Sequence, residues 1–204
     1  MNKALYTIFI IDDDESIRRS VSLVIKSAGY QTQVFAGVEQ FLENVNYAGE
    51  GCILLDVFLE GKSGLEMLEE IQGRFYNLPI IYFSGMGDIP MSVDAMKKGA
   101  INFLQKPLDD NQLLRAIDEA LIKSRELITD RVESARAEEL ISTLTPREDE
   151  ILRFLLTGML NKQIAAKLNI AEHTVKLHRG KITEKLGVKS VAELVRIAEK
   201  ANIK

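Results

Sequence analysis

The stretch YTIFIIDDD, residues 6–14, decides the fold of the front half of this chain. Residues 6–11 are all β-branched or aromatic, and the run stops abruptly at three aspartates, Asp12, Asp13 and Asp14. A strand without a polar face is typical of a parallel sheet that is covered on both sides. Acidic side chains directly after such a strand lie where open α/β sheets bind their ligands.

Four further short runs, at 31–35, 52–57, 79–84 and 101–105, have the length of a strand, and three of them are as apolar as the first. Amphipathic stretches with helical spacing separate the runs, and several end at a glycine such as Gly29 or Gly99. Five strand–helix units in a row predict an α/β doubly wound five-stranded parallel sheet over residues 1–122.

The back of the chain carries only helical signals. Thr145 and Glu148 have the spacing of a capping box with a proline between them, and Ser190 and Glu193 repeat that spacing. Asn161 is the expected cap of a short helix that precedes a longer one at about 172–186. Four helices joined by short turns predict a separate all-α helix-turn-helix domain over residues 143–204.

Residues 123–142 contain neither glycine nor proline, and they mix charges of both signs with scattered apolar residues. We therefore expect the last helix of the front domain to continue through them as a helical linker between the two domains.

The net charge of -4 divides unevenly along the chain. Residues 1–122 hold 10 Lys and Arg against 18 Asp and Glu, a balance of -8. Residues 123–204 hold 16 against 12, a balance of +4, and residues 161–204 alone hold 10 against 4. The acidic front therefore favours a cation, and the basic back favours a polyanion such as DNA.

Composition excludes several classes of protein. The 204 residues are 46% apolar and 27% charged, which indicates an ordinary globular chain. No run reaches the ~18 apolar residues that cross a bilayer, and the first residues lack the cleavage site of a secretory signal. The single cysteine, Cys52, excludes an internal disulfide. We expect a cytoplasmic protein without a membrane partner.

Polar residues follow the ends of four predicted strands: Asp12 and Asp13, Asp56, Ser84 and Lys106. Because the carboxyl ends of parallel strands meet at one edge, these side chains should lie together. Three clustered carboxylates repel one another and need a cation, and their hard oxygen atoms suit Mg²⁺ (or Mn²⁺).

This set of residues permits phosphoryl transfer to a carboxylate, in which positioning and charge neutralisation do most of the work. Asp56 is the predicted nucleophile and phosphorylation site. Asp13 and Asp56 hold the metal, with Asp12 assisting through water. Lys106 pairs with the phosphoryl oxygens, and Ser84 donates its hydroxyl to one of them.

The front domain resembles the receiver domain of two-component response regulators. The residues that carry the resemblance are Asp12-Asp13, Asp56, Ser84 and Lys106-Pro107, and the segment 87–100 is similar to the FixJ branch. The resemblance implies a CheY-like fold, a partner sensor histidine kinase, a cis Lys106–Pro107 peptide and an aromatic switch at Phe103. It also implies that the backbone carbonyl of Phe58 is a further metal ligand.

The chain departs from the receiver pattern at three positions near the expected site. Glu60 stands where relatives usually have proline, and Met86 stands where close relatives often have histidine. Ser84 takes a place often held by threonine, a change that keeps the hydroxyl. Phe58 and Met86 flank the expected path of an attacking water, and we expect their bulk to slow loss of the phosphate.

The helix at 172–186 has a buried face and an exposed basic face. With Val175 at zero on a helical wheel, Ile182 and Leu186 fall within ~20° of it, so these three define the buried face. Lys176 is expected to reach guanine, and Leu177 to touch a thymine methyl. The predicted DNA contacts are Thr174, Lys176, Leu177, Arg179, Gly180, Lys181 and Lys185.

The back domain resembles the LuxR-type helix-turn-helix, on the segments 144–148, 161–165, 174–178 and 185–186. Ala171 stands where serine often caps the recognition helix, which costs ~1 kcal/mol of capping energy. Gly180 replaces a larger residue on the groove face, so one base contact is expected to be missing or indirect.

The two resemblances together imply a transcriptional regulator of the NarL/FixJ response-regulator group rather than an enzyme. Phosphorylation of Asp56 is expected to drive formation of a homodimer that binds double-stranded promoter DNA and works with RNA polymerase. Two alternatives are a regulator that works without phosphate and a haloacid-dehalogenase-like phosphohydrolase that uses Asp12. A receiver, a linker and a DNA reader account for the length, so the phosphoryl group should come from another protein.

Overall fold

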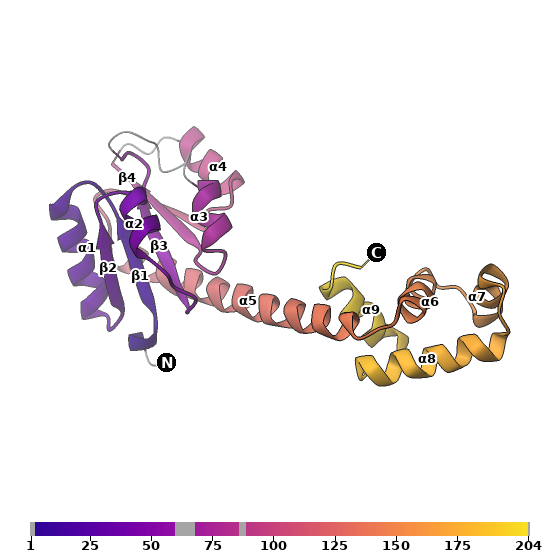
Figure 1. Ribbon diagram of the computed structural model, residues 1–204. Coiled ribbons are helices and arrows are strands. Elements are labelled where there is room, and N and C mark those ends of the chain that lie inside the picture. The colour runs from indigo at the N-terminus through magenta and orange to yellow at the C-terminus, as the bar shows by residue number, and fades with distance from the viewer. Residues whose placement is uncertain (1–2, 60–67, 86–88, 204) are drawn as a thin grey trace. The chain divides into compact units, whose positions relative to one another are not determined.

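The computed structural model describes residues 3–59, 68–85 and 89–203, which fall into two compact units, Met1–Ile128 and Thr129–Lys204. The first unit is a sheet flanked by helices, and the second is entirely helical (Figure 1). Within the described part of the chain, no helix is long and apolar enough to cross a membrane.

The first unit contains a five-stranded parallel sheet with the strand order β2-β1-β3-β4-β5. The strand order reverses at β1, so the crevice between β1 and β3 is the switch point at which doubly wound sheets bind ligands. The predicted fold class is confirmed. The elements of this unit are the 3₁₀ turn η1 (Lys3–Leu5), β1 (Thr7–Ile11), α1 (Glu15–Ser27), β2 (Gln31–Phe35), α2 (Val38–Asn44), β3 (Gly51–Asp56), α3 (Leu68–Arg74), β4 (Ile80–Ser84), α4 (Ile89–Lys97), β5 (Asn102–Gln105) and the first part of α5 (Asp110–Ser142).

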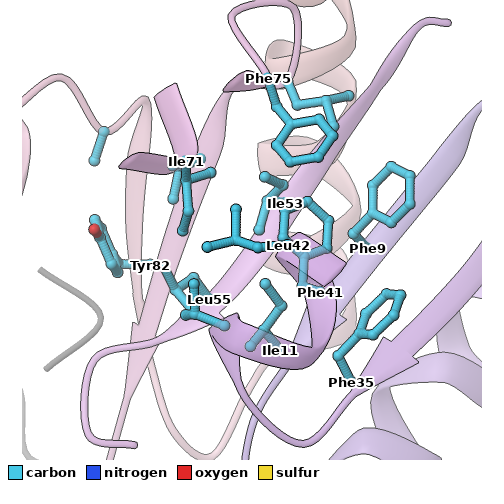
Figure 2. Close-up of a cluster of buried hydrophobic side chains, with 14 of the residues drawn as sticks. Phe9, Ile11, Phe35, Phe41, Leu42, Ile53, Leu55, Ile71, Phe75 and Tyr82 are labelled. Carbon is cyan, nitrogen blue, oxygen red and sulfur yellow. The ribbon is translucent and has the colours of Figure 1, made fainter. Parts of the chain in front are cut away.

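Two hydrophobic clusters cover the two faces of the sheet. On one face, Phe9 and Tyr82 of the strands pack with Phe41 of α2 and Ile71 of α3 (Figure 2). On the other face, residues of β1 and β3 pack with the apolar stripes of α1 and α5. Burial from both sides explains why β1, β3 and β4 carry almost no polar side chains before their last residues.

Asp14 caps the first helix, as its position after the first strand predicts. Its side chain accepts hydrogen bonds from the backbone N–H groups of Ser16 and Ile17. The cap satisfies two of the amides that a helix leaves unpaired at its start. The carboxylate of Asp14 is therefore engaged in capping α1, and Asp12 and Asp13 remain as the acidic residues at the end of β1.

The second unit consists of the last part of α5 with α6 (Pro146–Leu156), α7 (Asn161–Leu168), α8 (Glu172–Leu186) and α9 (Val191–Lys200). Their apolar faces meet in one cluster around Ile151, Leu152, Ile164, Val175 and Ile182, against which Leu140 and Ile141 of α5 also pack. The capping box of α6 is confirmed: Thr145 accepts from Glu148 N, and the Glu148 side chain accepts from Thr145 N.

Two predicted helix caps in this unit are wrong in detail. Leu160, and not Asn161, is the cap of α7, because the side chain of Gln163 accepts from Leu160 N while the Asn161 side chain accepts from α8. Ser190 caps α9 by accepting from Glu193 N, but the Glu193 carboxylate accepts from Lys189 N rather than from the Ser190 backbone.

Candidate functional site

The carboxyl ends of four strands bring the predicted polar residues together in the first unit. Strand register places Ile11 opposite Leu55, so Asp12 follows β1 beside Asp56, the last residue of β3. Ser84 ends β4 opposite Gln105, and Lys106 follows directly. The backbone N–H of Lys106 donates to the Ser84 carbonyl at 2.8 Å, and the Lys106–Pro107 peptide is cis, as the resemblance implied.

Lys106 joins the two buried carboxylates of this acidic pocket. Its Nζ lies 2.7 Å from Oδ2 of Asp12 and 2.7 Å from Oδ2 of Asp56. The side chain of Asp12 is fully buried, that of Asp56 is 6% exposed, and that of Lys106 is 17% exposed. One ammonium therefore offsets part of the repulsion between two carboxylates in a poorly solvated place.

Burial shifts the protonation of the pocket. It raises the pKa of the Asp12 carboxyl above the ordinary value, and the hydrogen bond from Lys106 offsets part of that rise. Burial also acts to lower the pKa of the Lys106 ammonium, but its hydrogen bonds to Asp12 and Asp56 outweigh that effect, so the net direction is upward. Lys106 thus stays charged at neutral pH.

The carboxylates of Asp12, Asp13 and Asp56 fit a divalent cation. Each can offer an oxygen atom such that the three atoms lie within 4.8 Å of one another. Asp13 is exposed, so this edge of the pocket opens to solvent. Three carboxylates against one lysine leave an excess of negative charge, and hard oxygen donors with access to water suit Mg²⁺ or Mn²⁺.

Two backbone contacts hold the loops that carry the carboxylates. Oδ1 of Asp12 accepts from Asp14 N at 2.7 Å, and Oδ1 of Asp56 accepts from Phe58 N at 3.2 Å. Arg18, which the sequence analysis missed, donates from Nη1 to the carbonyl oxygen of Asp12 at 2.6 Å. The sequence could have indicated this contact, because Arg18 is the fourth residue of α1 and a residue in the first turn of a helix lies near the preceding loop.

The other predicted residues of this pocket are placed as follows. Ser84 is fully buried, and Phe103 is half-buried on β5, in register with Tyr82 and against the hydrophobic cluster of Figure 2. Phe58 is 50% exposed. Glu60 and Met86 lie outside the described residues.

In the second unit, α7 and α8 form a helix-turn-helix. The turn between them spans residues 169–171, and Asn169 adopts the left-handed conformation with a φ of 52°. Val175, Ile182 and Leu186 of α8 are buried, as predicted. Ala171 provides no side-chain cap for α8.

The predicted DNA-contact residues differ in exposure. Arg179 and Thr174 are half-buried, and Nη1 of Arg179 donates to Oδ1 of Asn161 at 2.7 Å. Lys185 donates to Glu148 Oε2 at 2.7 Å and to the Thr143 carbonyl at 2.9 Å, so its ammonium is engaged within the unit. The exposed members of the set are Lys176, Leu177, Gly180, Lys181 and Lys185.

His178 lies on the side of α8 next to the buried face, where a histidine can either pack or cap. Its ring atom Nδ1 is buried and has no hydrogen-bond partner within the described part of the chain. The histidine therefore packs rather than caps.

Comparisons with known proteins identify the families of the two domains. Residues 8–118 match the response regulator receiver domain, and residues 142–198 match the bacterial regulatory proteins of the luxR family. Nodulation protein W of Bradyrhizobium diazoefficiens is 38% identical over 196 residues, which cover 96% of this chain and 86% of that protein. The transcriptional regulatory protein FixJ of the same species is 32% identical, with 96% of each chain covered.

Among solved structures, the response regulator StyR is 42% identical, with a TM-score of 0.76 over 97% of this chain and 100% of that one. The match spans both units and not one domain alone. The chain therefore belongs to the response regulators of the NarL/FixJ group, transcriptional regulators of two-component systems that join a receiver domain to a LuxR-type helix-turn-helix domain.

Proposed function

We propose that a sensor histidine kinase phosphorylates this regulator on Asp56. Response regulators of this kind pair with such kinases and bind DNA. The observation that carries the proposal is the contact of one lysine ammonium with both Asp12 and Asp56, at 2.7 Å each, in the crevice at the switch point of the sheet. A phosphoryl group on Asp56 would bring its oxygens to the same ammonium.

The transfer breaks the P–N bond of a phosphohistidine on the kinase and forms a P–O bond to a carboxylate oxygen of Asp56. The imidazole nitrogen keeps the electron pair of the broken bond. Asp12, Asp13, Asp56 and the Phe58 carbonyl would hold Mg²⁺ or Mn²⁺, which supplies positive charge for the phosphoryl oxygens. Lys106 balances the remaining charge. The chain acts as phosphoacceptor, with slow loss of its own phosphate, and not as an enzyme with turnover.

Ser84 and Phe103 are the proposed switch. Ser84 is the last residue of β4 and is fully buried. Phe103 lies on the neighbouring strand β5, which ends directly before Lys106. Movement of Ser84 toward the phosphoryl group would free space for the half-buried Phe103 to turn inward. The resulting change at α4 and β5 would favour a homodimer, and the exposed apolar side chains Val93 and Met96 on α4 support that surface.

The dimer would bind two half-sites of promoter DNA through α8 and work with RNA polymerase. Affinity would rise on phosphorylation because the second half-site is bound at high effective concentration. The proposed contacts are Lys176 and Leu177 to bases, and Thr174, Arg179 and Lys181 to phosphates, with Gly180 on the same face. Lys185 comes last, since its ammonium already pairs with Glu148. The proposed division remains 1–122 for the receiver, 123–142 for the linker and 143–204 for the DNA-binding domain.

The test is phosphorylation of the full chain by acetyl phosphate with Mg²⁺, followed by intact-mass measurement and by titration of promoter DNA. We expect one phosphoryl group on the native chain, none on Asp56→Asn, and tighter DNA binding only after phosphorylation. Phosphate on Asp12 would favour the phosphohydrolase alternative. Equal DNA binding with and without phosphate would favour the phosphate-independent regulator.

A further inference from the structure

Gly180 is a glycine for which the protein itself offers no structural reason. It lies in the interior of α8, a 15-residue helix, and it is absent from the residues with positive φ. A Cβ built on it would meet no described atom within 4 Å. Glycine inside a helix is unfavourable because it loses more backbone entropy on folding than alanine.

At other positions of the chain, the structure explains why the residue is glycine. Gly158 and Gly187 follow the ends of α6 and α8 with φ of 81° and 65°, a conformation that residues with a Cβ rarely adopt. In the receiver, a Cβ on Gly51 would lie 2.2 Å from the Thr7 carbonyl oxygen. Gly180 has neither a positive φ nor a close neighbour at its Cβ position. Thr183 Oγ1 donates to the Gly180 carbonyl, but a residue of any type at position 180 would offer the same acceptor.

Gly180 lies on the exposed face of α8. On the helical wheel it lies ~140° from Val175, between Lys176 at ~100° and Leu177 at ~200°. Lys176 and Leu177 are both exposed, and Leu177 is 62% exposed although it is a large apolar residue. The flanking exposed residues could contact a partner, while Gly180 leaves the helix backbone bare between them.

We propose that Gly180 is the point at which the backbone of α8 approaches the edge of the DNA groove too closely to admit a side chain, and that it is thereby a specificity-determining residue. The inference rests on the proposed DNA-binding function and deepens it. It reverses the expectation that a base contact is missing here: the absent side chain permits the approach that lets Lys176 and Leu177 reach the bases. Glycine serves this purpose wherever a backbone must come close to a ligand.

This proposal predicts opposite effects of one substitution on the free protein and on the complex. Gly180→Ala adds a single methyl group to an open position, so it should slow amide hydrogen exchange in 172–186 and raise the melting temperature of that unit by roughly 2–6 °C. The same methyl group should weaken binding to the specific duplex by about tenfold, the order of one mismatched base pair. Gly180→Leu should weaken it further.

The probe is a duplex selected from a random-sequence pool with the full-length native chain after acetyl phosphate treatment, compared with a scrambled duplex. Gly73→Ala is the matched control. Gly73 is also exposed, within a helix of the receiver, with no described atom within 4 Å of its Cβ position. We expect this control to leave affinity for the selected duplex unchanged.

Two results would overturn the proposal. If Gly180→Ala binds the selected duplex as tightly as the native chain, no close approach occurs there. If exchange in α8 instead becomes faster, the fold requires glycine at this position. Failure of the proposed function would be distinct, because the native chain would then enrich no duplex at all.

Discussion

The Nζ atom of Lys185 lies 2.7 Å from Oε2 of Glu148, an ion pair that joins α8 to α6 through a carboxylate only 4% exposed. The same carboxylate accepts from Thr145 N as part of the capping box. Lys185, which the sequence predicts to contact a DNA phosphate, thus forms an ion pair that connects α8 to α6. The pair connects the orientation of α8 to the stability of the whole helical unit.

Lys185→Ala should destabilise this unit by about 1–3 kcal/mol, because it leaves the buried Glu148 without its counter-charge. The measurement is urea denaturation of the full chain, with hydrogen exchange over 146–200 to assign the transition. Lys181→Ala is the control on the same helix, since Lys181 is exposed. It should leave stability nearly unchanged and reduce the salt slope of DNA binding by about one. The reverse pattern would make Lys185 the phosphate contact.

Stability of the helical unit should also depend on pH through Glu148. The hydrogen bond from Lys185, aided by Thr145 N, lowers the pKa of Glu148 from its ordinary 4.5 to about 2. A group with a depressed folded pKa contributes stability that is fully present above the unfolded value and is lost as pH falls toward the folded value. The unit should therefore weaken between about pH 5 and pH 2.

Glu148→Gln isolates this contribution. Its free energy of unfolding should lie below that of the native chain at neutral pH, and the two should converge as the pH falls toward 2. A gap between them that stays constant with pH would show that Glu148 does not titrate as its contacts require.

Arg179 and Asn161 couple the two helices of the helix-turn-helix through the 2.7 Å bond from Nη1 to Oδ1. Because Asn161 fixes one side of the guanidinium, Asn161→Ala should weaken DNA binding by about 3–10-fold without removing a charge. Arg179→Ala should weaken it at least as much and lower the salt slope by about one. In a double-mutant cycle the second substitution should add little. Fully additive losses would mean that the two side chains act independently on DNA.

The strands of the receiver could be predicted from the sequence because four of the five runs are short and almost continuously apolar. The run at 31–35 coincides with β2, and β1 begins one residue later than expected. Strand β3 begins earlier, at Gly51, where a Cβ would lie 2.2 Å from the Thr7 carbonyl oxygen of the neighbouring strand. That close approach depends on the pairing of two strands, which the pattern within one strand does not reveal.

The pocket residues could be placed together because parallel strands end at one edge, whatever the details of packing. Side-chain partners on α8 could not be assigned in this way. Lys185 lies ~80° from Val175 on the helical wheel, at the border between the buried and exposed faces. Its partner is Glu148, which lies on another helix and 37 positions away in the chain. Periodicity places a residue on a face, but it does not identify a contact between faces.

Lys106→Met should make the receiver depend on a divalent cation. Without the ammonium, the buried Asp12 and Asp56 repel each other, and the receiver should lose about 1–3 kcal/mol of stability in the presence of a chelator. Millimolar Mg²⁺ should restore much of that loss, because the cation replaces the missing positive charge among Asp12, Asp13 and Asp56. Lys123→Met is the matched control, since Lys123 forms a pair with Glu126 at 3.1 Å in which both side chains are about half exposed. It should be indifferent to Mg²⁺. A loss in Lys106→Met that is the same with and without Mg²⁺ would show that the three carboxylates do not share a cation, and the proposed route for neutralising the phosphoryl group would fail with it.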